Sequence, residues 1–127
     1  MKRLSPVLVV EAIEPVLPFW VDRLGFAKTA EVPEGDALGF VMLDKDGVQV
    51  MYQTLRSIAN DVETLADMPT GAAMLFIEVA DVDAVEQALE GVEQVIPRRK
   101  TFYGADEVVV RDPAGNVITF AEFAESG

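Results

Sequence analysis

Residues 74–79, MLFIEV, form a short apolar run that predicts a β-strand. Asp81 comes shortly afterwards and suits the N-cap of a helix, because its side chain can accept a hydrogen bond from the helix backbone. That helix carries Val82, Val85 and Leu89 on one face. A strand that leads into an amphipathic helix indicates an α+β module with the helix packed on its sheet.

The same order occurs in the first half of the chain. Residues 5–11 predict a strand, and residues 15–24 predict a helix that buries Val16, Phe19 and Trp20. Pro18 indicates that this helix starts irregularly. The half then continues with three further strands. The first half is therefore predicted to be a βαβββ module like the second.

The two halves align with each other at a nearly constant offset. Val10 corresponds to Val79 at an offset of 69 residues, and Gly47 corresponds to Gly115 at an offset of 68. One module duplicated within the chain explains the offset. The alternative is two unrelated α+β halves that are similar by chance. Duplication predicts a pseudo-twofold axis, with equivalent strands facing each other across a shared cleft.

Periodicity and turn residues predict the other elements and the organisation of the chain. Strands are expected at 26–32, 38–43, 48–54, 92–96, 106–110 and 116–123, a connecting helix at 57–67, and tight turns at 45–47 and 112–116. The chain is predicted to be one domain, with a first module at 4–55, a connecting helix and linker at 56–71, and a second module at 72–124.

Composition excludes several classes of function. The 127 residues carry a net charge of −12, which disfavours binding to nucleic acid or to anionic membrane surfaces. Cysteine and histidine are both absent, so disulfides, thiol nucleophiles and the commonest transition-metal ligand are excluded. The N-terminal residues do not have the pattern of a signal peptide, and a cytoplasmic location is expected.

Several stretches resemble a known family in their order and spacing. Residues 5–10, SPVLVV, precede FW at 19–20 and LGF at 24–26, and the second half contributes FIEV at 76–79, DVDAV at 81–85 and RDPAGN at 111–116. The chain resembles the glyoxalase and bleomycin-resistance proteins of the vicinal oxygen chelate superfamily. The resemblance implies two tandem βαβββ modules that form a curved mixed sheet around a shared cleft.

Metal-dependent members of this superfamily hold a divalent ion at the start of each module's first strand and on each last strand. The matching positions here are Ser5, Met51, Met74 and Thr119. Thioethers and neutral hydroxyls are poor ligands for such an ion. We therefore expect no metal and no cofactor, and neither glyoxalase nor ring-cleaving dioxygenase activity. An all-carboxylate magnesium site elsewhere is the alternative.

Residues 102–107, FYGADE, are most similar to the bleomycin-resistance branch, which shows Trp-Gly-x-Arg-Glu before the same Arg-Asp-Pro turn. Tyr103 stands at the Trp position and Glu107 matches the Glu, whereas Asp106 replaces the Arg. Members of the branch sequester bulky, often cationic antibiotics between the subunits of a homodimer. The resemblance thus implies a homodimer that binds a small aromatic or cationic molecule.

Strand alternation predicts which side chains line the cleft. The candidate ligand contacts are Val7, Val9, Trp20, Met51, Gln53, Met74, Phe76, Glu78, Tyr103 and Thr119. Core packing is the alternative for the apolar members, and filling of the vacant metal pocket is the alternative for the two methionines. Trp20 and Tyr103 either stack on a ligand or belong to the scaffold.

Three functions are compatible with these residues. The first is a metal-independent binding protein that sequesters an antibiotic or an aromatic metabolite. The second is a metal-free isomerase or lyase that uses Glu78, Glu107 or Glu122 as acid or base. The third is a structural or interaction domain with a closed cleft. The basic cluster 98–100, RRK, either recognises an anionic substrate or is a solvated loop.

Overall fold

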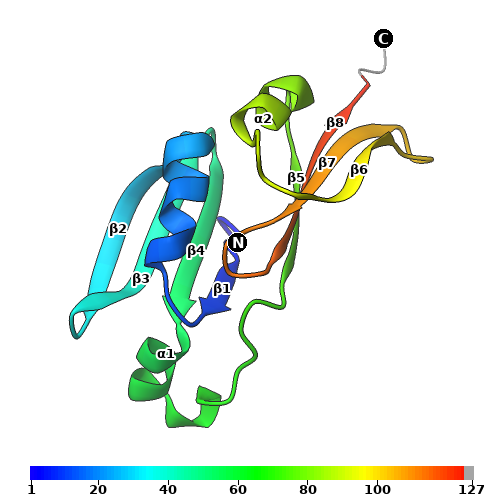
Figure 1. Ribbon diagram of the computed structural model, residues 1–127. Helices are drawn as coiled ribbons and strands as arrows, with labels where there is room; N and C mark the ends of the chain where they lie inside the picture. Colours follow the sequence, from blue (N-terminus) through cyan, green and yellow to red (C-terminus); the bar gives the residue numbers. More distant parts are fainter. Residues whose placement is uncertain (125–127) are drawn as a thin grey trace. The chain divides into compact units, whose positions relative to one another are not determined.

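The computed structural model describes residues 1–124 (Figure 1). The chain forms two compact units, one of residues Met1–Gly71 and one that begins at Ala72. Each unit contains one four-stranded mixed sheet and short helical segments. No helix within residues 1–124 is long and apolar enough to cross a membrane.

The first unit contains a strand, helical turns and three more strands. These are β1 (Val7–Val10), η1 (Glu14–Val16), η2 (Pro18–Arg23), β2 (Ala27–Glu34), β3 (Ala37–Lys45) and β4 (Val48–Thr54). The helix α1 (Leu55–Asp61) and the turn η3 (Glu63–Leu65) follow. The strand order is β1-β4-β3-β2, with β1 parallel to β4 and the other neighbours antiparallel.

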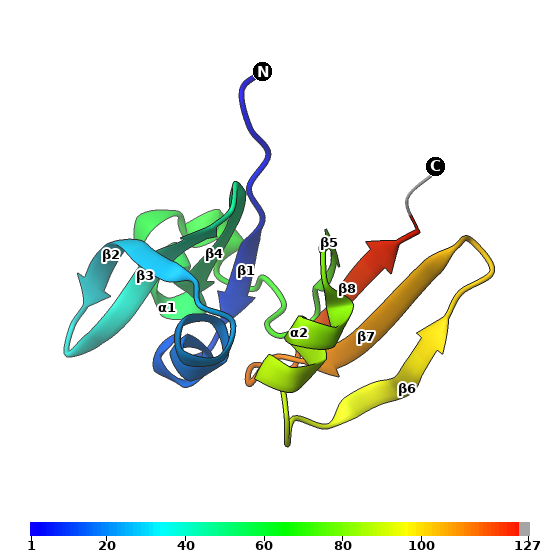
Figure 2. The ribbon, with the colours of Figure 1, turned by 90° about the horizontal axis from the view of Figure 1, so that it is seen from above.

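The second unit repeats this arrangement. Its elements are β5 (Met74–Glu78), α2 (Val82–Ala88), β6 (Gln94–Lys100), β7 (Ala105–Arg111) and β8 (Val117–Phe123). The strand order is β5-β8-β7-β6, again with only the first neighbouring pair parallel. Figure 2 shows α2 lying against one face of this sheet.

The strand register repeats together with the topology. Val7 lies opposite Met51 in the first sheet, and Phe76 lies opposite Thr119 in the second. Val7 and Phe76 are 69 residues apart in the chain, and Met51 and Thr119 are 68 apart, which are the offsets found in the sequence. The predicted α+β fold of two tandem βαβββ modules is therefore confirmed, with one sheet in each module.

The helical turns of the first unit pack on one face of its sheet. Val16, Phe19 and Trp20 are buried, as their spacing predicts. The Trp20 indole Nε1 donates a hydrogen bond to the Tyr52 hydroxyl at 2.7 Å. Its ring meets the rings of Phe19 and Phe26 edge-on, with centroids 5.3 and 4.9 Å apart. This face of the first sheet is therefore a closed core.

The helical stretch predicted at 15–24 is present, and it consists of two shorter helical turns rather than one regular α-helix. Pro18 has no N–H to donate to the preceding turn, so a regular α-helix cannot continue through it. The second turn, η2, is a π-helical turn. After it, the Phe26 N–H donates to the Trp20 carbonyl at 2.9 Å. Gly25 ends the segment with φ of 77°, a conformation that favours glycine.

The helix α2 begins where the sequence predicts. The Asp81 carboxylate accepts a hydrogen bond from the Ala84 N–H at 3.1 Å, which confirms the N-cap. Val82 and Leu89 are buried, as is Phe120 of β8. The apolar face of α2 thus closes one face of the second sheet.

Two other predicted boundaries differ from the structure. The connecting helix begins at Leu55 and not at residue 57, because the Thr54 hydroxyl caps it by accepting from the Ser57 N–H at 3.1 Å. The strand predicted at 92–96 extends to Lys100. Pro97 is tolerated there, because β6 is an edge strand with an irregular register at this point. Residues 98–100 therefore lie in a strand and not in a loop.

The two predicted turns form. Asp46 and Gly47 join β3 to β4 with φ of 52° and 82°, the left-handed conformations that a tight two-residue hairpin requires. In the turn before β8, one Asp112 carboxylate oxygen accepts from the backbone N–H groups of Ala114 and Asn116, at 3.0 and 2.8 Å. These residues therefore have a structural role.

Asn116 connects this turn to β5, and its substitution is expected to be destabilising. Its buried side chain donates to the Asp112 carboxylate at 3.0 Å and accepts from the Ala73 N–H at 2.9 Å. The substitution Asn116→Ala is expected to lower the free energy of unfolding by about 1–2 kcal/mol, because both partners lose a hydrogen bond. Urea denaturation measures the change. Asn60→Ala, at an exposed asparagine, is the control, and an equal change in both variants would contradict the prediction.

Candidate functional site

The second sheet has one face covered by α2 and one face without a helix. Successive side chains of a strand point to opposite faces. Ile118 and Phe120 of β8 are buried on the α2 side, so Thr119 and Ala121 point to the other side, called here the helix-free face. The strand register adds neighbours to this face, namely Met74, Phe76 and Glu78 of β5, Val117 and Phe123 of β8, Glu107 of β7 and Arg99 of β6.

Four aromatic side chains follow one another on the helix-free face and its adjoining hairpin, and we call them the aromatic row. The ring centroids of Phe76 and Phe123 are 6.2 Å apart, and those of Phe123 and Tyr103 are also 6.2 Å apart. Phe102 continues the row, edge-on to Tyr103 at 5.1 Å. Phe76 is 54% exposed and neighbouring Met74 is 77% exposed. The row therefore offers planar apolar surface to a ligand.

A buried carboxylate lies beside the aromatic row. Glu107 is only 2% exposed, and its two oxygens accept from the Tyr103 hydroxyl at 2.8 Å and from the Arg99 Nε at 2.9 Å. The hydrogen bond to Glu107 raises the pKa of Tyr103 above its ordinary value, so this hydroxyl remains a donor at neutral pH. The three side chains form one linked group at the edge of the face.

The first sheet also has a helix-free face, opposite its closed core. The register places Val7 beside Met51 and Val9 beside Gln53 on this face. Val7 is exposed, and the other three side chains are half-buried. The predicted set thus falls on the helix-free faces of the two sheets, with Val7, Val9, Met51 and Gln53 on the first and Met74, Phe76, Glu78 and Thr119 on the second.

Trp20 was predicted as a candidate ligand contact, but it does not lie on a helix-free face. Its side chain has no exposed surface and lies in the core of the first unit, where it binds Tyr52. Because η2 packs on the closed face of the sheet, Trp20 cannot reach a ligand on the other face. It belongs to the scaffold.

The three candidate acid–base residues have different surroundings. Glu122 lies on the α2 side, away from the helix-free face, and accepts from the Val82 N–H at 2.9 Å. Both oxygens of Glu107 are occupied by Tyr103 and Arg99. Glu78 is exposed at the end of β5, and its carboxylate has no hydrogen bond or ion pair within residues 1–124. It is the carboxylate best placed to meet a ligand.

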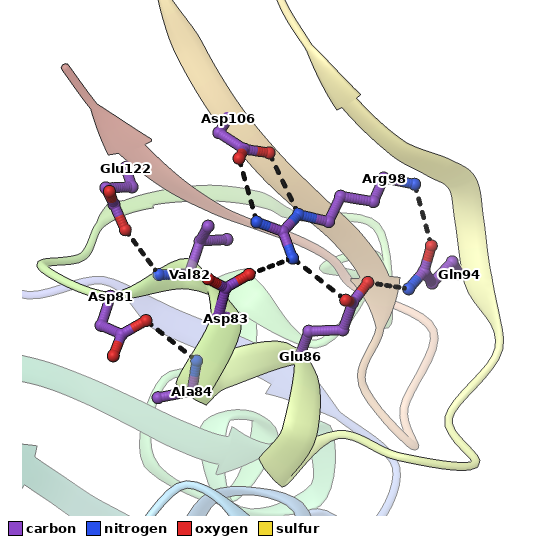
Figure 3. A network of polar contacts seen from close by, with 9 residues as sticks. All are labelled: Asp81, Val82, Asp83, Ala84, Glu86, Gln94, Arg98, Asp106 and Glu122. Carbon is purple, nitrogen blue, oxygen red and sulfur yellow. Dashed lines mark hydrogen bonds and ion pairs between the residues drawn. The ribbon is translucent and has the colours of Figure 1, made fainter.

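The basic cluster divides between the two faces of the sheet. On the α2 side, Arg98 binds Asp106 through two nitrogens, at 3.1 and 2.9 Å, and binds Asp83 and Glu86 of α2 through the third (Figure 3). This pairing holds the pKa of Asp106 below its usual range. Arg98 therefore braces α2 against the sheet. Arg99, the next residue, points to the helix-free face.

Sequence reasoning missed Phe123 as a site residue, and it considered Arg99 only as a member of the basic cluster 98–100, without assigning it to a face of the sheet. Phe123 lies four residues after Thr119 in β8 and therefore points to the same face, so strand alternation alone could have identified it. Arg99 could not be placed, because the strand carrying it was expected to end at residue 96. The irregular register around Pro97 hides the correct alternation in the sequence.

A family model described as the glyoxalase/bleomycin resistance protein/dioxygenase superfamily matches residues 3–120. The chain belongs to this superfamily. No curated protein sequence matches the chain. The two tandem modules that the resemblance implies agree with the topology of the two sheets.

Several solved structures of the superfamily are similar to this chain. A bleomycin-binding protein from the bleomycin producer Streptomyces verticillus, complexed with copper(II)-bleomycin, is 27% identical with a TM-score of 0.63, covering 98% of this chain and 99% of that chain. A glyoxalase/bleomycin resistance protein/dioxygenase from Nocardioides has a TM-score of 0.76 at 20% identity, covering 100% and 88%. TnmS3, an antibiotic binding protein from Streptomyces sp. CB03234, has a TM-score of 0.67 at 22% identity, covering 98% and 99%.

The residues at the metal positions of this superfamily do not fit a divalent ion. Ser5 donates its hydroxyl hydrogen to the Gln49 side chain at 2.5 Å, and Met51, Met74 and Thr119 supply no charge. Catalytic divalent metals are held by imidazole or carboxylate groups. Within residues 1–124, no three carboxylates come close enough together to hold a metal ion either.

Proposed function

We propose that this superfamily member binds a small aromatic molecule on the helix-free face of its second module, without a metal ion. The aromatic row is the observation that carries the proposal. Aromatic rings stack offset or edge-on with a planar ligand and bury apolar area on both sides. Phe76 already has its ring largely in solvent, so a ligand can reach it without unpacking the core.

The chemistry around the row supports an antibiotic-type ligand. The relative from Streptomyces verticillus, 27% identical over nearly the whole chain, is complexed with copper(II)-bleomycin. Glu78 lies two residues along β5 from Phe76, and within the described residues its carboxylate has no partner. This carboxylate can pair with a cationic group of such a ligand. Sequestration of an antibiotic or aromatic metabolite is the activity that this arrangement favours over turnover.

Thermal-shift measurements with metal-free bleomycin and a set of planar aromatic antibiotics test the proposal. We expect at least one compound to raise the melting temperature equally with and without EDTA, because ligand binding stabilises the folded state. A shift that appears only with added metal, and disappears with EDTA, would contradict metal-independent binding.

The substitution Phe76→Ala is expected to weaken binding of any compound found in that screen by about tenfold, because it removes one aromatic contact. Calorimetric titration measures the change. The Phe76 side chain is not a partner of Glu107, so the substitution leaves the hydrogen bonds of Glu107 to Arg99 and Tyr103 in place. Leu65→Ala, at an exposed apolar residue of η3, is the matched control and should not change affinity. Equal affinities of all three proteins would exclude the aromatic row as the binding surface.

We also propose that the protein is a homodimer, as the resemblance to the bleomycin-resistance branch implies. The exposed apolar side chains of Met74 and Phe102 support association, since such surface is usually covered by a ligand or a partner. Light scattering at micromolar concentration tests this, and a monomeric mass would contradict it.

A further inference from the structure

Arg98 and Arg99 are adjacent in β6 but are used differently. Arg98 engages all three of its guanidinium nitrogens with carboxylates of α2 and β7. Arg99 engages only its Nε, with Glu107 at 2.9 Å. Within residues 1–124, the two terminal nitrogens of Arg99 have no partner, and its side chain is 55% exposed, compared with 25% for Arg98. Arg99 therefore has unoccupied hydrogen-bond donors on the helix-free face.

Glu107 fixes the orientation of these donors. Its carboxylate is buried and is also held by the Tyr103 hydroxyl at 2.8 Å, so it cannot follow a mobile surface side chain. The guanidinium group is planar, and when its Nε faces Glu107 its two terminal nitrogens form the edge that remains available. Such an edge matches the two oxygens of a carboxylate. A donor pair that is already oriented loses little freedom on binding.

The side chains around the terminal nitrogens of Arg99 indicate which kind of ligand could bind there. The register forms one line across the helix-free face, from Glu78 through Ala121 and Glu107 to Arg99. The middle of the line, Ala121 and Glu107, is buried. The exposed side chains of the line are those at its two ends, Glu78 and Arg99. Tyr103 links the line to the aromatic row, because it contacts Glu107 through its hydroxyl and Phe123 through its ring.

We propose that the ligand of the helix-free face is a planar aromatic molecule carrying an acidic group, and that Arg99 binds this group. The inference rests on the proposed function and adds the charge of the ligand to it. The net charge of −12 repels anions at long range, so only direct hydrogen bonds can select one. Arg99 is the described residue that offers them beside the aromatic row.

The test compares 2-naphthoate with 2-naphthamide, which have the same rings but differ in charge. We expect the protein to bind naphthoate about tenfold more tightly than naphthamide by calorimetric titration, the size typical of a charge-assisted hydrogen-bonded pair. The Nε–H signal of Arg99 in a ¹⁵N NMR spectrum should shift on adding naphthoate. Arg99→Gln should reduce the preference to less than twofold, and Arg99→Lys should keep part of it.

Two controls separate a direct contact from a general charge effect. Arg111→Gln removes the same charge from the same sheet, about 13 Å away along the strand direction, and should keep the preference. The double variant Arg99→Gln with Glu107→Gln leaves the net charge unchanged. It should still lose the preference for naphthoate. Loss of the preference in Arg111→Gln to the same extent as in Arg99→Gln would overturn the assignment to Arg99.

The outcomes also distinguish this inference from the function on which it rests. If naphthamide or bleomycin binds, and Phe76→Ala weakens that binding, but naphthoate has no advantage, only the inference about Arg99 is overturned. If neither naphthalene compound, nor bleomycin, nor any screened antibiotic binds at millimolar concentration, both the inference and the proposed function are overturned.

Discussion

The substitution Trp20→Ala is expected to lower the free energy of unfolding by about 3–5 kcal/mol, the largest effect expected of any single change in the first module. The side chain is fully buried, makes edge-on contacts with Phe19 and Phe26, and donates to Tyr52. Alanine would leave a large cavity between η2 and the sheet. It would also remove the indole hydrogen bond.

Urea denaturation followed by circular dichroism measures this effect, because Trp20 is the single tryptophan of the chain and its fluorescence is lost in the variant. Trp20→Phe is the graded control. It keeps an aromatic ring but removes the hydrogen bond and part of the volume, so a smaller loss is expected. A change below about 1 kcal/mol for Trp20→Ala would show that this core is not packed as described.

The substitution Arg98→Met is expected to lower the free energy of unfolding by about 2–3 kcal/mol at neutral pH. Methionine keeps the apolar stem but leaves Asp83, Glu86 and Asp106 without the guanidinium that they share (Figure 3). These three carboxylates then lose their common counter-charge. Lys28→Met, at an exposed pair with Glu31, is the control and should cost less than about 1 kcal/mol.

The effect of Arg98→Met should depend on pH in a predictable direction. Arg98 lowers the pKa of Asp106 in the folded state, so the folded protein holds this proton less tightly than the unfolded chain does. The resulting stabilisation is complete at neutral pH and is lost as the pH falls below the ordinary aspartate value of 3.8. Urea denaturation at pH 7 and pH 3 should therefore show a smaller difference between wild type and Arg98→Met at pH 3. An equal difference at both pH values would contradict the role assigned to this pair.

Much of the fold was predictable because its signals are local. Strand alternation, the Asp81 cap and the turns at 45–47 and 112–116 depend on residues close together in the chain. The duplication was visible for the same reason, since each module repeats its own local pattern. Apolar spacing placed the helical stretch at 15–24 correctly, and Pro18 is the local signal that it is not one regular helix.

The candidate site was predictable only in part. Alternation correctly predicted that Met74, Phe76 and Glu78 share a face with Thr119, because parity within a strand follows directly from the sequence. The same reasoning could not place Trp20, since a helical side chain turns toward whichever face the helix packs on. Its burial against Tyr52 depends on a contact between residues that are 32 positions apart.

The amino-acid sequence determined by itself the type of each module, the repeat, and the absence of histidine and cysteine ligands, because these depend on local order and residue identity. The tertiary structure decided which neighbours each charged side chain acquired. Arg98 and Arg99 are consecutive and chemically identical, yet one braces α2 and the other faces the aromatic row. The physical reason is that the pleat of β6 sends consecutive side chains to opposite faces, and only the packing of α2 makes those faces different.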